Sequence, residues 1–269
     1  CGPEIGWIES GSADGLSLEG VSWAKNVEES DEIFHRAAKL IAAGGIVAVK
    51  GLGGYHLVCD AANEAALAAL RHRKHRPGKA FAVMVASVEE ARVFCDVNDA
   101  EARQLTSPAR PIVLLRKRSD AMLAKGLADN LPELGVMLPT TPVQHLLLHE
   151  CGGMLVMTSG NIHDEPIVID EETAFSQLAG VADAFLVNNR EIVGRYDDSV
   201  IRILNGGAAG DIVQFIRRAR GYAPLPVSAP CPEGASEGLL AVGPEQKSTL
   251  TYARAGKAFV SQQIGRAHV

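Results

Sequence analysis

Short apolar runs alternate with amphipathic segments along most of the chain. Apolar residues three and four apart predict helices, and unbroken apolar runs of four or five residues predict buried strands. The first predicted helix begins at the polar caps 29–32 and has its apolar face within 33–41. The other predicted helices are 61–72, 88–94, 100–105, 142–149 and 171–178. The predicted strands are 46–49, 80–85, 112–115, 154–158, 184–187, 200–203 and 212–216. This alternation predicts a mixed α/β fold with interior strands.

One domain over residues 29–227 is the simplest packing of these elements. The first predicted strand leads into a glycine-rich tight loop at 50–55. Residues 228–238 are rich in Pro, Ser, Ala, Gly and Glu without apolar periodicity, which is typical of a linker. Two further strands, 239–243 and 258–261, are too few to fold alone.

Composition and charge narrow the class of protein. The 269 residues are 47% hydrophobic with a net charge of −6, values typical of a soluble globular protein that does not coat nucleic acid. No apolar run approaches the ~20 residues of a membrane span, and no signal pattern opens the chain, so we expect a cytoplasmic protein without a membrane partner. The five cysteines are widely spaced and predict neither a metal site nor a disulfide framework.

The densest basic run follows the second predicted helix. Seven potentially cationic side chains occupy nine positions between Arg71 and Lys79, among them Lys74 and Arg76. A solvated helix end would place cations there, because they complement the helix dipole. The density next to Pro77-Gly78 fits a polyphosphate ligand better.

Two other segments carry groups suited to phosphate. Thr158-Ser159-Gly160-Asn161 follows a buried strand, where small hydroxyls and glycine admit phosphate oxygens to backbone N–H groups, although a simple cap or turn uses the same residues. Arginines follow the strand 212–216, either as guanidinium ligands of phosphate or as a basic domain edge. These arginines are Arg217, Arg218 and Arg220.

A fourth cluster places two carboxylates, Asp197 and Asp198, beside Ser199. Such a set suits a magnesium–phosphate site, and a charged β-turn equally. Several known motifs are absent: the chain has no GxxxxGK[ST], GxGxxG, GxSxG or HExxH sequence. The eight histidines are scattered and predict surface or structural roles rather than catalysis.

Taken in order, three segments resemble the YrdC/Sua family of ATP-dependent carbamoyl-adenylate formers. They are Tyr55-His-Leu-Val-Cys-Asp-Ala61, Lys74-His-Arg76-Pro-Gly-Lys79-Ala80 and Ser159-Gly160-Asn161. The resemblance implies a twisted mixed sheet with flanking helices and a concave basic nucleotide-binding face. Two departures are Ala80, in place of a proline, and His163, in place of a serine.

Further segments resemble the HypF carbamoyltransferases within that family, at 107–115, 134–142, 195–200 and 217–224. Residues 1–28 resemble the tail of a preceding zinc-finger-like region that ends near Cys1. Residues 239–269 resemble the truncated start of an actin-like carbamoyl-transfer domain. We therefore expect a piece of a longer protein, with zinc only in the missing upstream region.

The resemblance implies ATP-dependent formation of carbamoyl adenylate from carbamoyl phosphate or carbamate. The carbamoyl group would pass to the C-terminal cysteine of HypE in [NiFe]-hydrogenase maturation, with HypE and the other domains of the longer protein as partners. Lys50, Lys74 and Arg76 are the expected catalytic residues, and Asp197 and Asp198 the expected Mg²⁺ ligands. The expected ATP and carbamoyl-adenylate contacts are Lys74, Arg76, Lys79, Ser107, Arg110, Thr158, Ser159, Asn161, Ser199, Arg217, Arg218 and Arg220.

Three alternatives stay open. An antibiotic O-carbamoyltransferase shares the two domains, although the cysteine at position 1 favours the HypF-like assignment. A threonylcarbamoyl-adenylate synthase of tRNA modification fits less well, because the linker leads into a second enzyme-like domain. A double-stranded RNA-binding module is the non-enzyme alternative, since YrdC relatives have a basic concave face.

Overall fold

The computed structural model describes residues 2–11, 16–76, 78–162, 165–207, 210–229, 238–243 and 248–262. Cys1, His163 and most of the predicted linker lie outside these ranges, so the expectations that concern them stay predictions. Within the described residues, no helix combines the length and apolarity needed to cross a bilayer.

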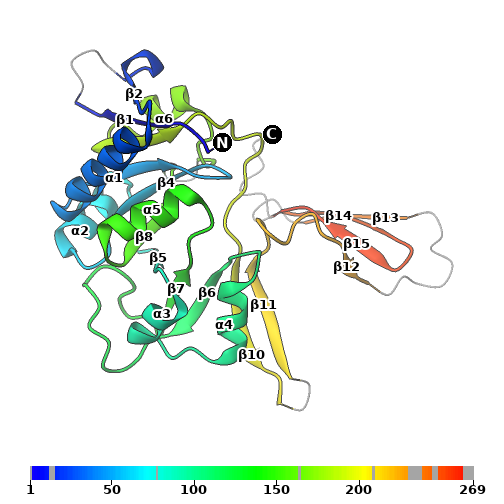
Figure 1. Ribbon diagram of the computed structural model, residues 1–269. Helices are drawn as coiled ribbons and strands as arrows, with labels where there is room; N and C mark the ends of the chain where they lie inside the picture. Colours follow the sequence, from blue (N-terminus) through cyan, green and yellow to red (C-terminus); the bar gives the residue numbers. More distant parts are fainter. Residues whose placement is uncertain are drawn as a thin grey trace.

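One eleven-stranded mixed sheet forms the centre of the molecule, in the order β11-β10-β6-β7-β5-β8-β4-β3-β9-β1-β2 (Figure 1). The pairs β3·β9, β5·β7 and β6·β10 are parallel, and the other pairs are antiparallel. This confirms the predicted mixed α/β fold. The strands are β1 Ile5–Glu9, β2 Ser22–Trp23, β3 Val47–Lys50, β4 Tyr55–Asp60, β5 Ala82–Met84, β6 Ile112–Arg116, β7 Glu133–Met137, β8 Leu155–Ser159, β9 Ala184–Asn188, β10 Val200–Asn205 and β11 Asp211–Arg217.

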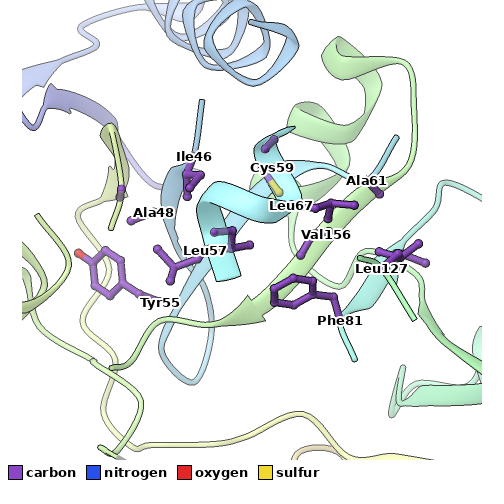
Figure 2. Close-up of a cluster of buried hydrophobic side chains, with 14 of the residues drawn as sticks. Ile46, Ala48, Tyr55, Leu57, Cys59, Ala61, Leu67, Phe81, Leu127 and Val156 are labelled. Carbon is purple, nitrogen blue, oxygen red and sulfur yellow. The ribbon is translucent and has the colours of Figure 1, made fainter. Parts of the chain in front are cut away.

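Helices pack on both faces of the sheet, which divides the buried apolar residues into two clusters. The cluster on one face includes Phe34 and Leu147, from helices α1 and α5. The other cluster includes Leu67 of α2 and Phe175 of α6, and Figure 2 shows part of it around Leu57 and Phe81. The helices are α1 Val27–Ala42, α2 Glu64–Arg73, α3 Val88–Phe94, α4 Asp99–Thr106, α5 Pro142–Cys151 and α6 Glu171–Gln177.

Local capping explains where these helices begin. Thr141 and Gln144 form a reciprocal capping box at the start of α5, with Pro142 in the first turn. The Asn26 side chain caps α1 by accepting from the Glu29 backbone N–H. Helix α1 therefore starts at Val27, a little before the predicted caps at 29–32, because asparagine is among the best N-cap residues.

Four strands of the sheet differ from expectation. Residues 55–60, which were not predicted as a strand, form the buried strand β4 between β3 and β8. Strand β1 pairs along its whole length with β9, and β2 pairs with β1, so the sheet begins before the expected boundary at residue 29. Strand β7 was also not predicted, because Gly135 interrupts its apolar run.

A separate four-stranded antiparallel sheet follows the main one, in the order β12-β15-β14-β13 (Figure 1). Strands β13 and β15 match the two strands predicted there, whereas β12 and β14 were missed. The bounds are β12 Val227–Ser228, β13 Leu239–Val242, β14 Leu250–Arg254 and β15 Lys257–Val260.

Candidate functional site

A buried lysine lies at the centre of the candidate site. Lys74 caps the C-terminus of α2 and is only 3% exposed. Its Nζ donates to the Ser159 carbonyl at 2.5 Å, the Asn161 carbonyl at 2.6 Å and Asn161 Oδ1 at 2.7 Å. Burial, and then the charges of Arg76 and Lys79, lower the Lys74 pKa to about 7. The structure thus brings the basic loop and the Ser159–Asn161 turn into contact.

Arg76 provides a second cation beside Lys74. Its Nη1 donates to Thr158 Oγ1 at 3.1 Å, and its guanidinium carbon lies 5.3 Å from the centre of the Phe81 ring. Burial lowers the Arg76 pKa to about 10, followed by the charges of Arg71 and Arg217. An anion placed here would relieve this repulsion among cations.

Not all of the basic run faces the site. The Arg71 guanidinium lies 4.4 Å from the Phe81 ring centre and donates to the carbonyls of Gly126 and Lys79. These contacts hold the loop after α2 close to Phe81 and Gly126. Arg71 thus stabilises the loop that carries Lys74 and Arg76.

The Ser159–Asn161 turn is held rigid by its own side chains. Ser159 Oγ donates to Asn161 Oδ1 at 2.7 Å, and Asn161 Nδ2 donates to the Glu165 carbonyl at 2.6 Å. Gly160 packs so closely on Tyr55 that a Cβ would lie 2.7 Å from its side chain and its carbonyl oxygen. Only glycine fits there, so the turn stays against the start of β4.

A second cationic edge comes from the end of β11. Arg217 Nη1 lies 3.4 Å from the Asp198 carbonyl oxygen and 3.9 Å from Asp197 Oδ1. Asp198 in turn contacts His56, whose register partner is Ser159, so this contact places Arg217 on the same side as the Ser159–Asn161 turn. The charge of Arg217 also lowers the pKa of Arg76. We refer to Lys74 and Arg76 as the first cationic edge and to Arg217 as the second.

The other two predicted arginines are held by neighbouring groups. Arg218 donates to the carbonyls of Tyr222, Leu225 and Val260, which join the main sheet to the small one. Arg220 binds Asp198 Oδ1 through Nε at 3.0 Å and Nη2 at 2.8 Å. The structure therefore brings Arg217, but not Arg218, to the first cationic edge.

Three residues expected to contact ATP lie instead next to backbone groups of the protein; they are Ser199, Ser107 and Arg110. The Ser199 hydroxyl is 1% exposed; it donates to the Arg220 carbonyl and accepts from the Ala219 N–H. Ser107 Oγ donates to the Gln104 carbonyl, and Arg110 Nη1 lies 3.4 Å from the Leu105 carbonyl oxygen. These groups shape the segment between α4 and β6 beside Arg220.

Asp198 is buried, and both of its carboxylate oxygens have side-chain partners. Besides Arg220, it faces His56, whose Nε2 lies 3.1 Å from Asp198 Oδ2. Burial alone would raise the pKa of the Asp198 carboxyl, but the hydrogen bonds and charges of His56 and Arg220 outweigh it and hold that pKa well below its usual range.

The expected magnesium ligands are therefore a poor fit. Both Asp198 oxygens already have side-chain partners, His56 and Arg220, and Asp197 lies near Arg217. Among the described residues, no three His, Cys, Asp or Glu side chains come together as a metal-binding group. The carboxylates in the described part of the chain thus offer no magnesium cage in this arrangement.

Lys50, expected to neutralise carbamate, is held by partners inside the protein. It is 5% exposed, and its Nζ forms an ion pair with Glu171 at the start of α6 and donates to the Asn188 carbonyl. The structure thus gives Lys50 an internal partner that no local sequence signal indicates.

Replacing Lys50 with alanine should lower the free energy of unfolding by about 3–5 kcal/mol, because Glu171 loses its partner in a mostly buried place. Urea denaturation measures this change. The double variant Lys50→Ala/Glu171→Gln should recover part of the loss, because no carboxylate is left unpaired. Equal stability of the two variants would contradict this role of the pair.

Known proteins resemble this chain in sequence. A family model described as Telomere recombination, named for Sua5, YciO and YrdC, matches residues 39–219. Carbamoyltransferase HypF2 of Cupriavidus necator is 47% identical over 255 residues, which cover 89% of this chain and 31% of that protein. The human threonylcarbamoyl-AMP synthase is 28% identical over 164 residues, covering 61% of this chain and 56% of that protein.

A solved structure is similar over the whole chain. It is described as full-length HypF in the phosphate- and nucleotide-bound form, with a TM-score of 0.84 and 42% identity, covering 100% of this chain and 32% of that one. The chain thus spans about a third of the length of its HypF relatives.

Proposed function

Because the chain belongs to the Sua5/YciO/YrdC family, we propose that its two cationic edges bind ATP and that it joins carbamate to the α-phosphate. The single observation that carries this proposal is that Lys74 and Arg76 meet the segment Thr158–Asn161, while Arg217 lies against Asp198, the partner of His56 on the neighbouring strand. The products are carbamoyl adenylate and pyrophosphate.

The reaction forms one bond and breaks one. A carbamate oxygen attacks the α-phosphorus, and the bond between that phosphorus and the bridging oxygen to the β-phosphate breaks in line. Lys74, Arg76 and Arg217 would neutralise the triphosphate and the leaving pyrophosphate. Thr158 and Asn161 would orient phosphate, ribose or the carbamoyl group, so catalysis is mainly positioning and charge stabilisation.

The wider role follows from the HypF relatives. We propose that the carbamoyl group then passes, through other parts of a longer cytoplasmic protein, to the C-terminal cysteine of HypE. Carbamate would come from carbamoyl phosphate. Magnesium would accompany ATP through its phosphate oxygens rather than through a protein cage.

ATP affinity should depend on pH through Lys74. Because its folded pKa is about 7, Lys74 is charged below that pH and becomes neutral above it, so ATP affinity should fall between pH 7 and pH 9. Calorimetric titration at several pH values measures the trend. Lys74→Arg should flatten the profile, because arginine stays charged; an equally steep profile in this variant would assign the dependence to another group.

ATP–pyrophosphate exchange tests the proposed reaction with this chain. Ammonium bicarbonate supplies carbamate in solution, so no other domain is needed to provide it. Labelled pyrophosphate should enter ATP in the presence of carbamate without threonine. Exchange that required L-threonine would instead assign the chain the reaction named for its human relative, and no exchange with either would overturn adenylation.

A further inference from the structure

His56 is the one buried histidine among the described residues, and the proposed chemistry does not use it. It lies second in β4, where its register partner is Ser159 of β8. The Ser159 carbonyl accepts a hydrogen bond from Lys74. His56 is thus one strand away from the first cationic edge.

The partner of His56 belongs to a distant part of the sheet. Strands β4 and β10 are separated by four strands, which would place them about 24 Å apart in a flat sheet. Residues 189–199, which we call the strap, connect β9 to β10. The strap lies against the start of β4, since the Tyr196 N–H donates to the Gly53 carbonyl and Asp198 contacts His56.

The strap also holds the end of β11. The Arg220 N–H donates to the Asp197 carbonyl, and the Arg220 side chain binds Asp198. The Asp198 carbonyl oxygen lies 3.4 Å from Arg217 Nη1. One carboxylate therefore joins β4, which lies beside the first cationic edge, to the segment that carries the second.

The buried position of the His56 ring costs free energy. Its Nδ1 is buried with no hydrogen-bond partner among the described groups, which destabilises the fold. The ring also packs on Gly51, where a Cβ would lie 2.9 Å from Nδ1. A buried unpaired polar atom of this kind requires an explanation, and a functional arrangement is one.

We propose that His56 is a positioning residue that, through Asp198 and the strap, sets the distance between the two cationic edges to that of a polyphosphate chain. This inference rests on the proposed function, because it assumes that both edges bind one triphosphate. Without His56 the edges would remain, but their spacing would vary. A ligand that spans both edges would lose affinity, whereas a single phosphate held at one edge would not.

Calorimetric titration with inorganic tripolyphosphate and with orthophosphate separates these cases. His56→Ala should weaken tripolyphosphate binding about tenfold, within the usual range of coupling between sites, and change orthophosphate binding by less than about twofold. His56→Gln should bind tripolyphosphate nearly as the wild type does, because its amide N–H can reach Asp198. His35→Ala, which removes an ion pair with Glu150 on an exposed part of α1, is the control and should change neither affinity.

Unchanged tripolyphosphate affinity in His56→Ala, or an equal loss for both anions, would overturn this role. Where His56→Ala does not fold, Asp198→Asn should give the same selective loss, because an amide NH2 replaces one of the two carboxylate oxygens that face His56 and Arg220. Failure of the wild-type chain to bind tripolyphosphate would overturn the proposed function itself.

Discussion

Replacing Lys74 with alanine should weaken ATP binding about 100-fold. The substitution removes the buried positive charge of the first cationic edge, and interactions with a charged group contribute about 1.5–3 kcal/mol. It also leaves the Ser159 and Asn161 oxygens without their shared donor, so the turn beside the phosphates loses its anchor. Calorimetric titration with ATP and the rate of ATP–pyrophosphate exchange both measure the loss.

Two controls make the Lys74 result interpretable. Lys39→Ala removes an exposed lysine from the last turn of α1, away from both cationic edges, and should leave ATP affinity unchanged. Thermal unfolding of Lys74→Ala should still be cooperative, since α2 keeps its buried apolar residues. A folded Lys74→Ala variant with wild-type ATP affinity would refute the site.

Replacing Asp198 with alanine should lower the free energy of unfolding by about 3–5 kcal/mol, because it leaves Arg220 without its anion inside the protein. Asp198 also joins His56 to Arg220, so several segments lose one shared contact. Urea denaturation measures the change. Asp120→Ala, which removes an exposed partner of Arg118, is the matched control and should leave stability unchanged.

The same carboxylate predicts the direction of acid sensitivity. Because the folded pKa of Asp198 lies well below its unfolded value of about 3.9, its stabilisation is complete above that value and is lost as pH falls towards the folded pKa. The melting temperature of the wild type should therefore drop below about pH 4. Asp198→Asn should show a smaller drop over the same range, and an identical drop in both proteins would assign the effect to other groups.

Local sequence signals place several candidate site residues at the ends of their helices and strands. Lys74 follows an Ala/Leu-rich helix, and Ser159 ends an apolar strand, so each could be placed at the end of its own element. Their meeting requires α2 to pack on the sheet beside β8, and the resemblance to the YrdC/Sua family supplied that arrangement.

The features that were missed depend on contacts distant in sequence. Lys50 and Glu171 lie 121 residues apart, and His56 and Asp198 lie 142 apart, so neither pair leaves a local pattern. Strand β4 was not predicted, since glycines precede it and His56 interrupts its apolar run. It lies between β3 and β8, and an apolar cluster covers each of its faces, which no propensity of residues 55–60 reveals.

Transfer of oxygen from carbamate to AMP tests the central claim most directly. The chain is incubated with ATP, Mg²⁺ and carbamate formed from ammonia and ¹⁸O-labelled bicarbonate, and the released AMP is analysed by mass spectrometry. Attack of a carbamate oxygen on the α-phosphorus predicts AMP that carries one ¹⁸O atom, and none in Lys74→Ala. AMP without the label, formed at the same rate with or without carbamate, would contradict carbamoyl-adenylate formation at this site.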